Sequence, residues 1–238
     1  MFVNEFHISM PISSNQYFKG RSFLTINSIS EADAIDFNGV LREKFYGEAD
    51  LRKGRKLDGV YSEKHTRLDD SVPWFIRKLI GEDVCKLREQ CWDSAPYVKY
   101  ILSSPRISKK KCMVTIEILA KDDLAVKSNT LSLSSNHLKH RKIAEIDLSD
   151  GSPKSRLYVA IYGRCRIPGI ANYFSHTITT RAPEFLRNLT VDIIASIGQC
   201  SDLTLKELKE IEEAVWRGKF GTVTEEGFDD TEEFMDSE

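Results

Sequence analysis

Apolar and polar positions alternate through the middle of the chain and recur with helical spacing near its end. Alternation with a period of two, typical of half-buried strands, occurs at 2–10, 40–48, 59–68, 113–120 and 156–163, and more weakly at 142–148. Apolar residues spaced three and four apart predict helices at 13–30, 71–81, 181–198 and 204–217. Strands followed by terminal helices predict one α+β domain, in which a curved, mostly antiparallel sheet is packed by helices.

The last predicted helix places a carboxylate among its apolar side chains. Thr204 and Glu207 have the spacing of a capping box, which marks the start of the helix. At about 100° per residue, one arc of the helix collects five apolar residues: Leu205, Leu208, Ile211, Val215 and Trp216. Glu212 falls inside this arc, where a carboxylate is costly unless a partner meets it. Glu212 is therefore either a salt-bridged residue at the edge of the arc or an acceptor that faces a ligand.

The strand predicted at 59–68 carries polar residues on both faces. Because side chains alternate along a strand, Ser62 and Lys64 share one face, whereas Glu63 and His65 share the other. A hydroxyl and an ammonium group therefore lie side by side on a face with apolar ends. This pattern fits a solvated edge strand or one wall of a polar site.

The stretch EQCWDSAPYVKYIL at 89–102 brings Trp92 and Asp93 close to Pro96, just before an apolar run. Two interpretations remain open on the residues alone. The stretch is either an ordinary corner between a helix and a strand, or one wall of a ligand site.

Charge is distributed unevenly along the chain. The last fourteen residues hold eight acidic side chains and no basic ones, so removing these eight from the total of 36 leaves 28 acidic against 34 basic residues, a net charge of +6. We therefore expect one domain over 1–217, followed by a flexible acidic tail over 218–238. The mildly basic body suits an anionic membrane surface or a nucleic acid without requiring either.

The composition and the first residues indicate in which cellular compartment the protein is expected and to which class of protein it belongs. The 41% apolar content is typical of a soluble globular protein, and no apolar run approaches the roughly 20 residues that a membrane span needs. The first residues lack the basic segment and apolar core of a signal peptide, so a cytoplasmic protein is expected. The five cysteines include no C-x-x-C pair and are interpreted as reduced thiols rather than a disulfide framework or a zinc site.

No catalytic or nucleic-acid-binding pattern stands out. The five histidines lack metal-ligand spacing, and the sequence contains no nucleophile motif or phosphate-binding glycine loop. The basic stretches at 108–112 and 138–142 lack the interleaved aromatic residues of a nucleic-acid platform. We therefore expect a protein that is not an enzyme, that binds no metal or cofactor, and that has no nucleic-acid partner.

Four motifs in order along the chain resemble those of the phosphatidylinositol transfer proteins, in particular the small single-domain class. They are the strand EFHISMPIS, then SVPWFIRKLI, then EQCWDSAPYVKY, and finally DLTLKELKEIEE. The resemblance covers residues 1 to about 217, and the loop between 142–148 and 156–163 is much shorter than the family's regulatory loop. It implies a START-like helix-grip fold, a sheet wrapped around a long apolar cavity that holds one phospholipid with its head group inward.

The resemblance also implies site residues. The family's inositol-binding threonine, lysine, asparagine and glutamate fall on Ser62, Lys64, Asp93 and Glu212. Asp93 replaces an amide with an acid, and Lys64 is the expected partner of its charge. A carboxylate can accept hydrogen bonds from two neighbouring ring hydroxyls, while an ammonium group and a hydroxyl donate to others.

The phosphate and membrane contacts depart from the family pattern. The family's phosphate-binding residues fall on Tyr100, Ile118 and Val159, of which only Tyr100 can donate, so Arg21 is a candidate replacement. The family's membrane-docking tryptophans fall on Ile167 and Pro168, and we expect Ile167, Pro168 and Ile170 to form a smaller apolar wedge that contacts membranes transiently.

The expected function is that of a monomeric carrier exchanging one phospholipid, phosphatidylinositol or phosphatidylcholine, between membranes. A carrier or sensor of the same fold for another lipid, such as phosphatidic acid, is the main alternative. An enzyme with a lipid cavity and an adaptor that recruits a partner through the acidic tail also remain open.

Overall fold

A mixed sheet and the helices on its inner face make up most of the described molecule. The computed structural model describes residues 1–31, 37–52, 55–67, 86–104, 107–125, 128–166 and 171–220. The strands are β1 (Phe2–Met10), β2 (Phe37–Arg52), β3 (Arg55–Arg67), β4 (Lys86–Ser94), β5 (Tyr97–Ser103), β6 (Cys112–Lys121), β7 (Arg141–Asp147) and β8 (Ser155–Cys165). The helices are α1 (Ser14–Glu31), α3 (Ser135–Lys139), α4 (Ala171–Ser196) and α5 (Leu205–Phe220), with a 3-10 turn, η3, at Ile197–Cys200.

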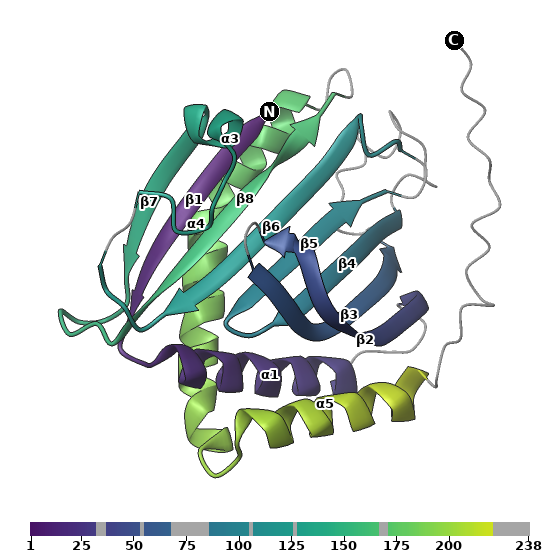
Figure 1. Cartoon of the computed structure of the whole chain (residues 1–238), viewed down its shortest axis with the longest axis vertical. Helices are drawn as coiled ribbons and strands as arrows, with labels where there is room; N and C mark the ends of the chain where they lie inside the picture. Colours follow the sequence, from purple (N-terminus) through teal and green to yellow (C-terminus); the bar gives the residue numbers. More distant parts are fainter. Residues whose placement is uncertain are drawn as a thin grey trace.

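The strands form one sheet in the order β2-β3-β4-β5-β6-β8-β1-β7. Neighbours run antiparallel except β1 and β7, which pair in parallel at one edge. Figure 1 shows the sheet curving, with α1 and α5 side by side across its open end and α4 passing behind β1 and β8. The α+β fold with a curved, mostly antiparallel sheet is confirmed.

The two faces of the sheet bury different clusters. On the inner face, Phe6, Ile8, Ile118 and Val159 pack with residues of α1 and α4 in the largest hydrophobic cluster. On the outer face, Tyr97, Leu119 and Tyr158 pack beneath the segment that contains Leu131 and Leu133. The main hydrophobic cluster therefore lies between the inner face of the sheet and helices α1 and α4.

Several predicted boundaries differ from the structure. The helix expected at 181–198 begins ten residues earlier, at Ala171, and contains Pro183. Its first turns are rich in polar and β-branched residues, which weakens the helical pattern, and packing of Ile178 against the core compensates. The strand containing Ser62 lies between β2 and β4, so the edge-strand interpretation is wrong. The helix predicted at 71–81 and residues 221–238 of the predicted tail lie outside the described residues. Residues 218–220, predicted to begin the flexible tail at 218–238, instead belong to α5.

A buried charge cluster ties the parallel edge strand β7 to β1. His7 is 3% exposed, and its Nε2 and Nδ1 lie 2.8 Å from Glu5 and 2.9 Å from Glu145. Arg141 completes the cluster by donating to the second oxygen of Glu5 at 3.0 Å, and the Tyr158 ring meets the imidazole edge-on. The hydrogen bond with Glu5, assisted by the charge of Glu145, outweighs burial and raises the pKa of His7. The charged imidazolium therefore bonds a carboxylate at each nitrogen.

This cluster makes stability depend on pH. Because the pKa of His7 is raised on folding, its contribution is fully present below the unfolded value of about 6.5 and is lost as pH rises through the folded pKa. We expect His7→Gln to lower the free energy of unfolding by about 1 kcal/mol or more at pH 6, and by less at pH 9. Urea unfolding at both pH values measures the difference. His140→Gln, at an exposed helix end, is the control and should change stability little at either pH; equal losses at both pH values for His7→Gln would contradict the expectation.

Candidate functional site

A cavity of about 450 Å³ lies between the inner face of the sheet and helices α1, α4 and α5. Its apolar wall is formed by residues from α1, β5, β6, β8 and α4, among them Leu24, Leu102, Ile116, Ile161 and Leu186. Its polar residues come from α1, β2, β3, β4, β5 and α5. The cavity is therefore amphipathic, with charged groups concentrated toward one end.

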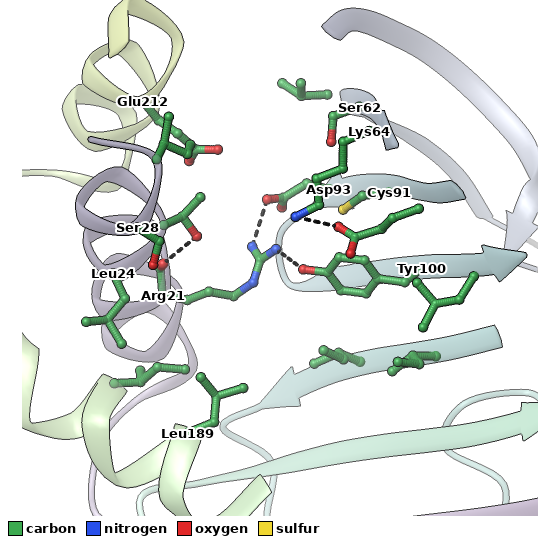
Figure 2. Close-up of a pocket in the computed structure, with 18 of the residues that line it drawn as sticks. Arg21, Leu24, Ser28, Ser62, Lys64, Cys91, Asp93, Tyr100, Leu189 and Glu212 are labelled. Carbon is green, nitrogen blue, oxygen red and sulfur yellow. Dashed lines mark hydrogen bonds and ion pairs between the residues drawn. The ribbon is translucent and has the colours of Figure 1, made fainter. Parts of the chain in front are cut away.

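The structure brings six of the predicted site residues to this one cavity. Ser62 and Lys64 enter from β3, Asp93 from β4, Tyr100 from β5, Arg21 from α1 and Glu212 from α5. Figure 2 shows these side chains converging from the helices on one side and the strands on the other. Ile167, Pro168 and Ile170 lie outside the described residues, so their role stays a prediction.

Asp93 is held by two cations from different helices. Its Oδ2 accepts from Arg21 Nη1 at 2.7 Å and from Lys209 Nζ at 2.8 Å. Arg21 Nη2 also donates to the Tyr100 hydroxyl at 2.7 Å. Burial alone raises the pKa of Asp93, but the charges of Arg21 and Lys209 outweigh it and hold that pKa well below its usual range. Asp93 is thus ionised at any physiological pH, and among the described residues no hydrogen-bond partner reaches its Oδ1.

Glu212 is buried on the inner side of α5, with 3% of its surface exposed. Arg42 Nη2 donates to Oε1 and Lys209 Nζ to Oε2, both at 2.9 Å. The predicted apolar arc is rotated by one position, because Ile211 is 39% exposed while Glu212 takes the buried place. Glu212 is therefore salt-bridged, as one interpretation expected, but it is buried, and two cations meet its charge within the cavity wall.

Lys64 pairs with a neighbour that the sequence analysis did not select. Its Nζ lies 3.0 Å from Glu89, which stands directly opposite it on β4. The expected pair between Lys64 and Asp93 is wrong, because Asp93 stands opposite Val60, four residues away along β3. Ser62 lies between these levels on the same face and opposite Cys91, whose buried thiol has its pKa raised to about 12 by desolvation.

The stretch at 89–102 is a hairpin between two strands rather than a corner between a helix and a strand. β4 and β5 turn at Ala95 and Pro96 through a cis peptide bond. Trp92 points to the outer face, where its ring lies 5.0 Å from that of Tyr61. Alternation along β4 then directs Asp93 to the inner face and into the cavity wall.

The described charges that line the cavity balance. Arg21, Arg42 and Lys64 oppose Asp93, Glu89 and Glu212, and each of these acids lies within 3.0 Å of one of the three cations. Arg42 also stacks over Trp216, its guanidinium carbon 5.0 Å from the ring centroid. The cavity end is therefore preorganised and close to neutral.

Arg42, Lys209 and Glu89 are charged residues at the polar end that the sequence analysis missed. Lys209 stands one helical turn before Glu212, a spacing at which an acid and a base can pair, so the sequence contained a weak signal for it. Arg42 lies on β2, and no local pattern places it against α5.

The described part of the chain contains neither a metal-binding cluster nor a membrane-spanning helix. No group of three or more histidine, cysteine or acidic side chains within the described ranges is arranged to hold a metal ion. None of the helices in the described part of the chain is long and apolar enough to span a membrane.

Comparison with known proteins identifies the family of this chain. The family model described as phosphatidylinositol transfer protein matches residues 1–162. Phosphatidylinositol transfer proteins 1 and 4 of Dictyostelium discoideum are 29% and 26% identical over 149 residues, which is 63% of this chain and 54% and 44% of theirs. The phosphatidylinositol transfer protein beta isoform of Homo sapiens is 29% identical over 157 residues, which is 64% of this chain and 54% of the human protein. The chain thus spans about half the length of the curated relatives it matches. Because the family model covers more than half of this chain, the chain belongs to the phosphatidylinositol transfer protein family.

Proposed function

We propose that this protein carries one phospholipid, phosphatidylinositol or phosphatidylcholine, and exchanges it between membranes. The observation that carries the proposal is the amphipathic cavity, in which apolar walls run up to a buried cluster of balanced charges. Membership of the phosphatidylinositol transfer protein family supports the same cargo class.

The apolar walls provide what transport of a two-chain lipid requires. Exposing about thirty methylenes to water costs roughly 0.8 kcal/mol each, more than about 20 kcal/mol in all. We propose that the chains extend past Phe185 and Leu189, which line the cavity yet are 64% and 37% exposed.

At the polar end, four side chains are proposed to hold the head group. Oδ1 of Asp93, to which no described residue donates a hydrogen bond, and the remaining lone pairs of Glu212 can accept from hydroxyls, while Lys64 and Ser62 can donate. Arg21 and Tyr100, already hydrogen-bonded to each other, are the proposed phosphate contacts. Glu212 lies beyond the matched range of the family model, so its assignment rests on its position in the cavity.

The charge balance bears on the choice of lipid. A phosphodiester adds one negative charge to an end that is already neutral, which Arg21 and Tyr100 can share by charge-assisted bonds. The phosphomonoester of phosphatidic acid adds between one and two negative charges. Asp93 cannot take up a proton to offset them, because its pKa is held low. A phosphodiester with neutral hydroxyls on its head group is therefore the preferred cargo over phosphatidic acid.

We propose that α5 acts as a lid, since Glu212 and Lys209 on its inner side close the polar end. Ile167, Pro168 and Ile170 remain the proposed membrane contact, and they lie between the end of β8 and the start of α4. Opening at a membrane surface would exchange one lipid for another without exposing the chains to water.

Mass spectrometry of lipid that co-purifies with the full chain tests the proposal. We expect one phospholipid per protein, enriched in phosphatidylinositol, and transfer of labelled phosphatidylinositol between vesicles. Phosphatidic acid as the main bound lipid would support the alternative cargo. A cavity without lipid, together with no transfer, would overturn the carrier function.

A further inference from the structure

Two cysteines face each other where β6 begins and β8 ends. Cys112 and Cys165 are partners in the antiparallel register, and both are half-buried free thiols. Alternation along β6 places Cys112 on the same inner face as Ile116 and Ile118, which line the cavity. Ile118 lies six positions after Cys112 on β6, so the thiol pair is about 20 Å along the strand from the part of the cavity that Ile118 lines.

The hydrogen-bond pattern shows which kind of cross-strand pair this is. Arg166 N donates to Lys111 O at 2.7 Å, so residues 111 and 166 form a hydrogen-bonded pair. Such pairs alternate along an antiparallel ladder, and the next pair, Cys112 with Cys165, is therefore non-hydrogen-bonded. In such pairs the Cα atoms are about 4.5 Å apart, within the range of about 4.4–6.8 Å that a disulfide spans. The strands thus hold the two thiols where a bond can form with little backbone movement.

We propose that Cys112 and Cys165 form a reversible cross-strand disulfide when a hydroperoxide oxidises them. The thiolate of one cysteine attacks the peroxide and becomes a sulfenic acid, releasing an alcohol, or water from hydrogen peroxide. The second thiol then attacks the sulfenic sulfur, forms the S–S bond and expels water. Two thiols and one hydroperoxide therefore give one disulfide, one alcohol and one water.

The other described cysteines lack this arrangement. Cys91 faces Ser62 and Tyr100 across its neighbouring strands, and the thiol of Cys200, at the end of η3, donates to Ser196 O at the end of α4. Both are almost fully buried, whereas Cys112 and Cys165 are accessible in part. The pair also lies close in sequence to the predicted membrane contact, since Cys165 ends β8 two residues before Ile167. The site follows from strand register alone and does not depend on which lipid the cavity holds.

The rate of this oxidation should depend on pH. Burial and the neighbouring Cys165 raise the pKa of Cys112 to about 12, and only the thiolate attacks a peroxide. The pair therefore stays reduced near neutral pH unless the peroxide is sustained. The rate should rise by up to about tenfold per pH unit between pH 7 and pH 9.

Treating the purified full chain with hydrogen peroxide, followed by mass spectrometry, tests the proposal. We expect the intact mass to fall by two hydrogens, and dithiothreitol to restore it. Trypsin should release peptides 112–121 and 165–166 joined together. Cys112→Ser and Cys165→Ser should each abolish this product, while Cys91→Ser and Cys200→Ser, as matched controls, should retain it.

Two results would overturn the proposal. One is a folded protein whose thiols at 112 and 165 gain oxygen without ever joining. The other is a loss of two hydrogens that persists in Cys112→Ser, because another pair would then be responsible. Measuring phosphatidylinositol transfer on the same oxidised sample keeps the two questions separate, since a disulfide can form whether or not the protein carries that lipid.

Discussion

Replacing Glu212 with alanine is expected to slow transfer of phosphatidylinositol between vesicles about tenfold or more, and transfer of phosphatidylcholine by less. Glu212 is 3% exposed and keeps acceptor lone pairs beyond those used by Arg42 and Lys209. A hydrogen bond to a charged group contributes about 1.5–3 kcal/mol, and every 1.4 kcal/mol is a factor of ten. Inositol hydroxyls can donate to these lone pairs, whereas a choline head group carries no hydroxyl. The ratio of the two transfer rates, measured on one preparation, is the decisive quantity.

The same substitution also removes a partner from Arg42 and Lys209, and controls must separate this effect. Glu210→Ala removes a 66% exposed acid from the same helix and should leave both rates unchanged. Lys64→Ala, on the opposite wall, should lower the ratio in the same direction as Glu212→Ala. An equal loss of both activities would mean that Glu212 only fastens α5, and unchanged rates in both variants would refute the head-group assignment.

The fold was predictable where local signals and tertiary packing agree. The capping box at Thr204 and Glu207 is present, with Thr204 N 2.7 Å from the glutamate and Glu207 N 3.2 Å from the threonine hydroxyl. β2 runs from Phe37 to Arg52, well beyond the predicted 40–48, because pairing with β3 extends it through charged residues and register shifts that no alternation marks. The parallel pairing of β7 with β1 likewise depends on a long-range contact.

The site was predictable as single positions but not as pairs. Alternation placed Ser62 and Lys64 on one face, and helical spacing placed Glu212 among buried residues. Which charges meet depends on register and on how α5 lies over β2. Lys64 therefore meets Glu89 directly across the ladder, and Asp93 meets Arg21 from α1. One sequence without such three-dimensional information cannot assign these partners.

Replacing Arg21 with methionine is expected to lower the free energy of unfolding by about 3 kcal/mol at pH 7. The side chains of Arg21 and Asp93 are only 13% and 11% exposed, and removing one partner of a buried pair costs about 3–5 kcal/mol because the other charge stays buried. Lys209 still contacts Asp93, which places the loss at the lower end. Because the pKa of Asp93 is lowered on folding, the pair's contribution is present above the unfolded value of about 3.9 and is lost as pH falls through the folded pKa. The difference between the wild type and the variant in urea unfolding should therefore shrink below about pH 4.

The double variant Arg21→Met with Asp93→Asn distinguishes an unpaired charge from lost packing. Without the aspartate charge, removing Arg21 leaves a neutral amide that can still accept from Lys209, so the double variant should be more stable than Arg21→Met alone. The two residues share a direct contact, so their effects should not add, and the coupling energy is expected to be about 1–3 kcal/mol. If the two losses simply sum, Arg21 stabilises the protein through its packing against the cavity wall, and Asp93 does not need its charge. In that case the balanced charges at the polar end would not be what preorganises it, and the phosphate contact proposed for Arg21 would have to be judged on cargo binding alone.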